Sequence, residues 1–143
     1  MHKKITKYSL DTIKIGQKKD FVITINEQMI EQFAKLSGDY NPLHVDDEYA
    51  KKTDFKHRIC HGMLLASFFS QLVGMYLPGE NALYLSQTLK FQSPCFINDT
   101  ITVQGKVVNK SISTKIITIK TSIINLRGDL LVDGQAKVMV RDD

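Results

Sequence analysis

Residues 62–77 read GMLLASFFSQLVGMYL, a run that is apolar on nearly every side of a helix and that ends at Pro78-Gly79. A helix without a polar face is expected to be buried on all sides. A membrane span needs about 20 predominantly apolar residues. This run is shorter and is interrupted by Ser67, Ser70 and Gln71. We therefore interpret it as a core helix that the rest of the chain must enclose.

The enclosing layer is predicted from the β-rich residues that follow the core helix. Four long runs rich in β-branched residues cover residues 83–91, 100–108, 115–126 and 130–140. They are separated by short breaks at Ser93-Pro94, Asn109-Lys110 and Arg127-Gly128-Asp129. Short turns between long strands are typical of antiparallel neighbours. The sequence therefore predicts an α+β fold, in which a curved antiparallel β-sheet encloses one long hydrophobic helix.

A second helix is expected before the core helix. A short β-rich run at residues 21–25 stops at Asn26, a favourable N-cap residue. Apolar side chains then recur at helical spacing, at Met29, Ile30, Phe33 and Leu36. Gly38 stands where a left-handed C-terminal cap is expected. After it, Pro42 favours an ordered turn over more helix, and residues 46–52 are expected to form one or two helical turns.

Length and composition indicate one soluble domain over residues 1–143. The chain has 143 residues, of which 43% are hydrophobic and 24% are charged, as in ordinary globular proteins. The formal net charge of +4 is uneven, because residues 1–19 carry six Lys against a single acidic residue, Asp11. We interpret this lysine-rich stretch as a solvated leader. The remaining chain is not basic, which argues against a nucleic-acid partner.

Three features of the sequence indicate where the protein is located and whether it binds a metal or cofactor: its cysteines, its histidines and its N-terminal residues. Cys60 and Cys95 are too few for a disulfide framework. The N-terminal residues lack the apolar stretch of a signal peptide. The histidines, at His2, His44, His57 and His61, do not have compact metal-ligand spacing. The sequence therefore predicts a cytoplasmic protein with no metal site, no cofactor and no membrane partner.

The densest cluster of chemically able side chains is residues 37–46, SGDYNPLHVD. Asp39 and His44 are five residues apart across a turn stiffened by Pro42, so a carboxylate and an imidazole can face one pocket. General acid/base work on a water molecule requires such a pair. Judged on spacing alone, structural roles are the better interpretation, with Asp39 and Asn41 in Asx turns and His44 partly exposed in a loop.

The start of the core helix adds a second feature. Gly62 is placed to offer an unpaired backbone N–H at the positive end of the helix dipole, which favours an oxygen that gains negative charge. Close packing at the helix entrance would explain Gly62 equally well, and His61 is expected to cap the helix or to lie in the core. Ser70 could reach the same pocket, although a serine in a buried helix more often bonds back to its own helix.

Two stretches resemble a known family. Residues 33–46, FAKLSGDYNPLHVD, are similar to the hydratase motif of the MaoC-like dehydratases, the (R)-specific enoyl-CoA hydratases. Residues 59–67, ICHGMLLAS, resemble the second signature of that family, and the resemblance extends over nearly the whole chain. This sequence departs from the family pattern at the flank of the second signature. Arg58 stands where the family often has Pro, and Cys60 stands where it more often has Ala or Val. The resemblance implies the hot-dog fold and a homodimer.

The resemblance also implies roles for single residues. Asp39 and His44 take the catalytic positions, Gly62 supplies an amide to the thioester oxygen, Asn41 belongs to the substrate-binding set, and Ser70 supports the hydrogen bonds of the site. The implied activity is that of a hydro-lyase, which adds water reversibly to trans-2-enoyl thioesters and forms (R)-3-hydroxyacyl products without a cofactor or metal. The acyl carrier is CoA or acyl carrier protein.

Two other functions fit the same scaffold. A hot-dog acyl-CoA thioesterase would bind the same thioester but would direct water to the carbonyl carbon, so it would release free thiol from saturated acyl-CoA. A non-catalytic acyl-thioester-binding module would have no reason to keep both Asp39 and His44 in such a turn, and we rank it last.

Overall fold

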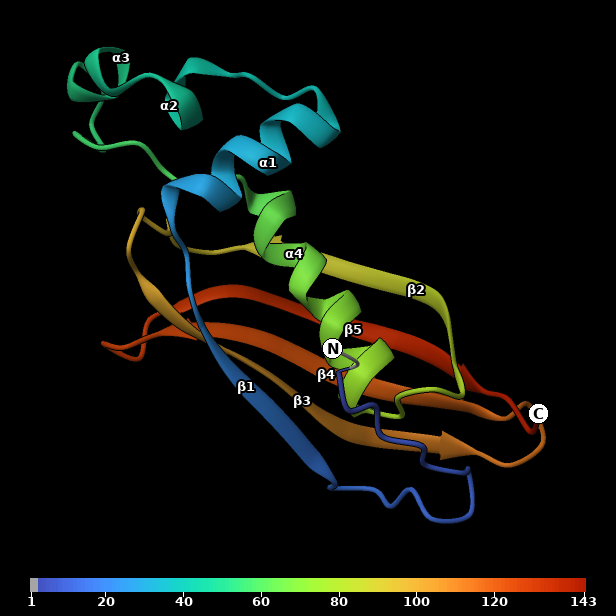
Figure 1. Cartoon of the computed structure of the whole chain (residues 1–143). Helices are drawn as coiled ribbons and strands as arrows, with labels where there is room; N and C mark the ends of the chain where they lie inside the picture. The colour runs from blue at the N-terminus through green and yellow to red at the C-terminus, as the bar shows by residue number, and fades with distance from the viewer. Residues whose placement is uncertain (1–2) are drawn as a thin grey trace.

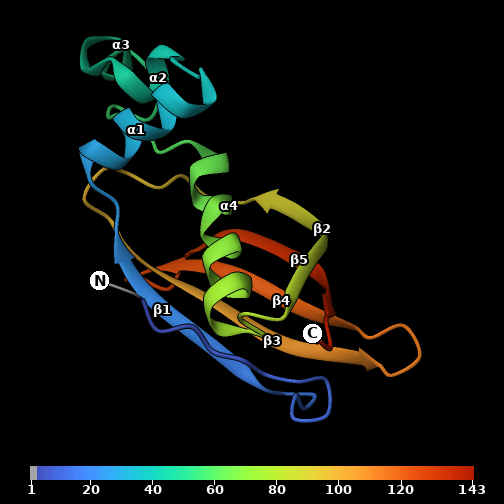
Figure 2. The ribbon, with the colours of Figure 1, turned by 45° about the vertical axis from the view of Figure 1, so that its right-hand side comes forward.

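The computed structural model describes residues 3–143 as a curved sheet with a central helix lying on one of its faces (Figure 1). The helices are α1 (Glu27–Ser37), α2 (Pro42–Val45), α3 (Asp47–Lys51) and α4 (Gly62–Gln71), and α4 continues into a π-helical turn, η1 (Leu72–Tyr76). The strands are β1 (Lys18–Thr24), β2 (Ala82–Phe91), β3 (Thr100–Ser111), β4 (Ile116–Asn125) and β5 (Leu130–Val140). Helices α1 to α3 form a lobe near the N-terminus of α4 (Figure 2).

All strand pairs of the sheet are antiparallel, in the order β1-β3-β4-β5-β2. The predicted α+β fold is therefore confirmed, and so are tight connections from β3 to β4 and from β4 to β5. The break at Ser93-Pro94 does not join neighbours, because β2 pairs with β5 while β3 lies beside β1. Residues 92–99 instead cross the sheet. On the way they pass the start of α4, where the N–H of Cys60 donates to the carbonyl of Cys95 at 2.7 Å.

The central helix is buried on one side only. Leu64, Leu65 and Phe69 lie against the sheet, whereas Met63, Ser67 and Ser70 are exposed. The expectation that this helix is buried on all sides is therefore wrong for a single chain, because one sheet covers only the facing half of the helix. Within residues 3–143, no helix has both the length and the apolar character needed to cross a bilayer.

The lysine-rich N-terminal stretch differs from the predicted solvated leader. Ile13 is fully buried in the core beside η1, and the N–H groups of Thr6 and Tyr8 donate to the carbonyls of Met75 and Pro78, each at 3.1 Å. Most of the lysine side chains are exposed, and their number led to the prediction of a solvated leader. The stretch packs on the core nevertheless, because Ile13 is buried there. Residues 1–2 of the predicted leader lie outside the described residues.

Helix α1 has the predicted ends and positions the residues after it. The side chain of Asn26 accepts from the N–H of Met29 at 2.9 Å, and Gly38 closes the helix with a left-handed φ of 79°. The predicted ordered turn that follows contains the short helix α2, with Pro42 in its first turn. Proline suits that position because it needs no intrahelical N–H bond there. As expected, α1 does not continue through this turn, but the sequence analysis did not predict the separate short helix that begins at Pro42.

Candidate active site

A cavity of about 480 Å³ lies between the lobe and the N-terminus of α4. Asp39, His44, His61 and Gly62 line one part of it, and Gln92 and Ser93 add further polar groups. Much of the remaining wall is apolar, from side chains that include Phe55, Cys60, Met63, Leu65, Phe91 and Leu131. The fold thus brings both sequence stretches singled out above to one apolar cavity.

Asp39 combines a local structural role with a place in the cavity. One oxygen of its carboxylate accepts from the N–H of Asn41 at 3.1 Å, which closes an Asx turn. The side-chain oxygen of Asn41 in turn accepts from the N–H of Leu43 at 3.1 Å and caps α2. The turn bonds predicted as the structural alternative are therefore present, and they hold Asp39 at the edge of the cavity.

His44 is half-buried and has a defined tautomer. Its Nδ1 lies 2.8 Å from the main-chain carbonyl oxygen of Ile59. Because a carbonyl can only accept, Nδ1 carries the hydrogen, and the neutral ring keeps the lone pair on Nε2. His44 can therefore accept a proton at Nε2.

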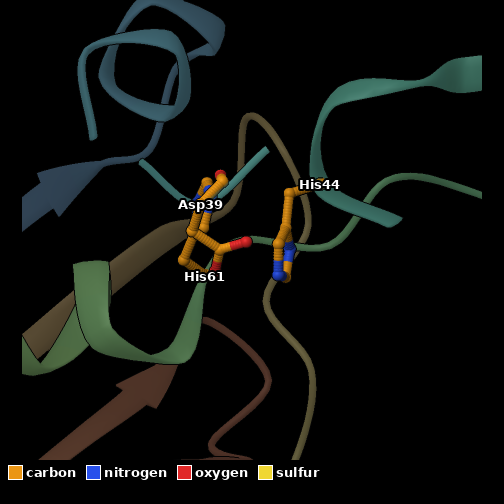
Figure 3. Close-up of side chains that lie close together, drawn as sticks. All are labelled: Asp39, His44 and His61. Atoms are coloured by element: carbon orange, nitrogen blue, oxygen red, sulfur yellow. The ribbon is translucent and has the colours of Figure 1, made fainter. Parts of the chain in front are cut away.

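His61 lies directly before α4, and its side chain is 1% exposed. Its Nε2 donates to the main-chain carbonyl of Asp39 at 3.0 Å, and its ring stacks on that of His44 with centroids 4.1 Å apart. Burial lowers the pKa of His61, so the ring is neutral at neutral pH. Of the two expected roles, the core role holds, since the side chain makes no helix-capping bond. Figure 3 shows the three side chains together.

The same three residues could hold a cation. Asp39, His44 and His61 each offer one ligand atom, and these atoms lie within 4.8 Å of one another. The predicted lack of a metal site rested on the spacing of the histidines in the sequence, and the fold removes that argument by bringing His44 and His61 together. A carboxylate and two imidazoles can bind a divalent ion or position a water molecule.

Gly62 begins α4 and borders the cavity. Its φ lies outside the left-handed region, so its conformation does not require glycine. A Cβ atom built on Gly62 would lie 2.8 Å from Cε1 of Phe91, so any larger residue would require this half-exposed ring to move. The N–H groups in the first turn of a helix have no intrahelical acceptor, so the Gly62 amide can donate to a bound oxygen.

Two residues expected in the substrate-binding set do not line the cavity of the single chain. The side-chain oxygen of Asn41 is directed to the start of α2, where it accepts from Leu43. Ser70 is exposed, eight residues after Gly62 on the outer side of α4. In the single chain, therefore, the side chain of Asn41 is occupied by a local cap, and the rotation of α4 directs Ser70 away from this cavity. The substrate-binding roles of both residues stay predictions.

Arg58 helps to hold the site together, a role that the sequence analysis did not predict. Its side chain is 8% exposed, with Nη2 2.6 Å from Oε1 of Glu27 and Nε 2.8 Å from Oδ1 of Asp47. Burial alone would lower the pKa of Arg58, but the bonds to these carboxylates outweigh burial and raise it. The guanidinium therefore ties α1 and the start of α3 to the chain before α4. The only signal in the sequence was a charged residue beside a buried helix.

Two thiols complete the wall of the cavity. Cys60 and Cys95 are free and buried. A hydrogen bond with Cys95, together with burial, raises the pKa of Cys60, so its thiol stays protonated. A protonated, buried thiol is a poor nucleophile, and both side chains serve as small apolar groups.

Comparison with known proteins assigns the family. Residues 11–127 match the model of the MaoC like domain, so the chain belongs to this family. An (R)-specific enoyl-CoA hydratase of Rhodospirillum rubrum is 43% identical over 130 residues, covering 91% of this chain and 90% of that protein. A mitochondrial 3-hydroxyacyl-[acyl-carrier-protein] dehydratase of Arabidopsis thaliana is 34% identical, covering 90% and 78%.

A solved structure agrees with the fold. The unliganded R-hydratase PhaJ1 of Pseudomonas aeruginosa superimposes with a TM-score of 0.92 at 34% identity, and the match covers 97% of this chain and 89% of that one. The hot-dog fold implied by the resemblance is therefore confirmed.

The bonds of Arg58 predict its effect on stability. We expect Arg58→Met to lower the free energy of unfolding by about 1–3 kcal/mol, because two charge-assisted hydrogen bonds are lost while the buried side-chain volume is kept. Urea denaturation measures this change. The matched control is Arg127→Met, which removes an exposed pair with Asp129 and should change stability by less than about 0.5 kcal/mol. Equal effects of the two substitutions would contradict the bracing role of Arg58.

Proposed function

We propose that this protein is an (R)-specific enoyl-CoA hydratase, a hydro-lyase that adds water reversibly to trans-2-enoyl thioesters. The observation that carries the proposal is the convergence of Asp39, His44 and the Gly62 amide on one apolar cavity. The relative from Rhodospirillum rubrum, named as an enzyme of this activity, supports it. We also place the protein in the cytoplasm, where the free thiols of Cys60 and Cys95 would stay reduced.

Asp39 and His44 would hold the attacking water. The carboxylate of Asp39 and Nε2 of His44 each accept one hydrogen of the water, whose oxygen then bonds to C3 of the enoyl group. The pair removes a proton from this water and delivers one to C2 from the same side, so that H and OH add across the double bond. The proton that leaves the water thereby balances the proton that C2 gains, and the acid/base pair is restored.

The Gly62 amide would act on the thioester. As oxygen bonds to C3, negative charge moves from C2 toward the carbonyl oxygen. An N–H at the N-terminus of a helix stabilises such charge directly and through the helix dipole. The apolar wall around the cavity fits an acyl chain, and CoA is the carrier we propose, with acyl carrier protein as the alternative that the Arabidopsis thaliana relative represents.

One prediction of the proposed function concerns the acid/base pair. Asp39→Asn and His44→Ala should each reduce turnover by about 10²-fold or more, because each removes a proton-transfer group. The double variant should lose far less than the product of the two effects, since both groups act on one water. The measurement is loss of enoyl-thioester absorbance with crotonyl-, hexenoyl- and decenoyl-CoA.

Matched controls separate chemistry from folding. Asp46→Asn changes an exposed carboxylate that caps α3, and asparagine can keep that cap, so turnover should not change. Release of free thiol from saturated acyl-CoA is followed in parallel, because it would indicate a thioesterase. Near-parental turnover of a folded Asp39→Asn or His44→Ala protein would contradict the role of that residue.

Another prediction distinguishes the loss of the Gly62 N–H from the steric effect of a side chain at this position. Gly62→Pro deletes the N–H, and the backbone permits proline because His61 already has φ −57° and ψ 132°. Gly62→Ala is the control: it adds the same Cβ against Phe91 but keeps the N–H. We expect Gly62→Pro to lose about 10²–10³ in rate relative to Gly62→Ala, with equal helix content by circular dichroism. Equal rates would show that the amide is structural.

We further propose a homodimer. β2 is an edge strand of the sheet, and apolar side chains are exposed on it and beside the cavity, with Leu83 and Leu85 each 47% exposed and Met63 56% exposed. An exposed edge strand is a pairing site, and a second copy there could also cover the outer side of α4. Light scattering should give twice the 16.2 kDa chain mass. Fully active particles of single-chain mass would contradict the proposal.

A further inference from the structure

We infer that His61 is a positioning residue, which holds the main chain of Asp39 and the ring of His44 in one fixed arrangement. The inference rests on the proposed function and gives a task to a side chain that takes no part in the proton transfers. His61 contacts both partners: Nε2 donates to the Asp39 carbonyl at 3.0 Å, and the ring lies 4.1 Å from the His44 ring, centroid to centroid.

The bond to Asp39 spans parts of the fold that are distant in sequence. The other bonds of Asp39 are local, because its N–H donates to Oγ of Ser37 and its carboxylate accepts from Asn41, each two residues away. Local bonds shape the turn but do not orient it relative to α4. His61 directly precedes α4, so its hydrogen bond fixes the exposed turn of Asp39 relative to the helix whose first amide belongs to Gly62.

The stack fixes the ring of His44. The hydrogen bond from Nδ1 to the Ile59 carbonyl holds one edge of that ring. A single hydrogen bond does not stop the imidazole plane from turning about the N–H···O axis. The face of His61, inclined by 29°, restricts the rotation. Phe33 supports His61 in turn, with its ring edge-on at 4.9 Å. Stacked and edge-on contacts at these separations are favourable, so Nε2 of His44 keeps one direction in the cavity.

The environment of His61 suits this task. The titratable groups that face its ring are Asp39 and His44, and burial is the main cause that lowers the pKa of His61. A neutral His61 keeps its N–H on the Asp39 carbonyl and puts no charge beside His44 when that ring takes up a proton. Its Nδ1 is buried and has no hydrogen-bond partner among the described residues, so protonation there would bury an N–H that no acceptor satisfies.

The experiment separates the two contacts. His61→Phe keeps a ring for the stack and removes the donor, His61→Gln keeps a donor and removes the ring, and His61→Ala removes both. We expect kcat for crotonyl-CoA to fall by about 10-fold in the first two and by about 10²-fold in His61→Ala, because small misplacements of reacting groups cost this much. KM should change by less than about threefold. His57→Phe, at an exposed histidine outside the cavity lining, should keep the parental kcat.

A second readout does not depend on turnover. Nitrogen-15 NMR of the parent protein should show the Nδ1–H tautomer of His44 and the Nε2–H tautomer of His61. In His61→Ala, or in the Phe and Gln variants if His61→Ala does not fold, the signals of the Asp39 amide and the His44 ring should shift and broaden. Unchanged signals overturn the inference, and so does a parental kcat in all folded variants or an effect on KM alone. An inactive parent would contradict the proposed function and leave the NMR result to decide on His61.

Discussion

The close contact between η1, which continues the central helix, and the inner strand β3 of the sheet determines where the site can form. A Cβ atom on Gly105 of β3 would lie 2.8 Å from Cδ2 of Leu72, so the helix approaches the sheet as closely as a glycine allows. Because protein interiors are tightly packed, such a contact leaves little freedom in the position of the helix. With α4 held there, its N-terminus faces the lobe of α1 to α3 (Figure 2), and the cavity lies between the two.

The short segment just before α4 joins the lobe to this frame. Arg58 binds the carboxylates of Glu27 and Asp47, the carbonyl of Ile59 accepts from His44, and His61 donates to the Asp39 carbonyl. Three residues of this short segment therefore bind different parts of the lobe. The proposed acid/base pair and the proposed oxyanion donor sit on different elements, and this segment sets the distance between them.

Patterns that repeat along the chain were readable from the sequence. Helical spacing and the caps at Asn26 and Gly38 predicted α1, and alternation with turn residues predicted the long strands. The motif around Asp39 and His44 predicted which residues meet in a cavity, because those residues are neighbours in the chain. Each of these signals is local: periodicity and cap residues were enough for the helix and the strands, whereas the catalytic interpretation of the motif needed the family resemblance.

Contacts between distant segments were not readable in this way. The crossing after Ser93-Pro94 depends on which strand edge is free, and the burial of Ile13 depends on a gap beside η1. The approach of His61 to His44 and the orientation of Ser70 depend on how α4 is rotated against the sheet. No spacing rule encodes such arrangements, so the sequence predicted neither the cluster of Asp39, His44 and His61 nor the exposed position of Ser70 in the single chain.

The central claim is that one side of one cavity supplies both the hydroxyl and the proton. Hydration of crotonyl-CoA in deuterium oxide, with NMR assignment of the product at C2 and C3, tests it most directly. The account predicts (R)-3-hydroxybutyryl-CoA with deuterium at C2 added from the same side as the hydroxyl, and no release of free CoA. An (S) product, addition from opposite sides, or thiol release without hydration would contradict it.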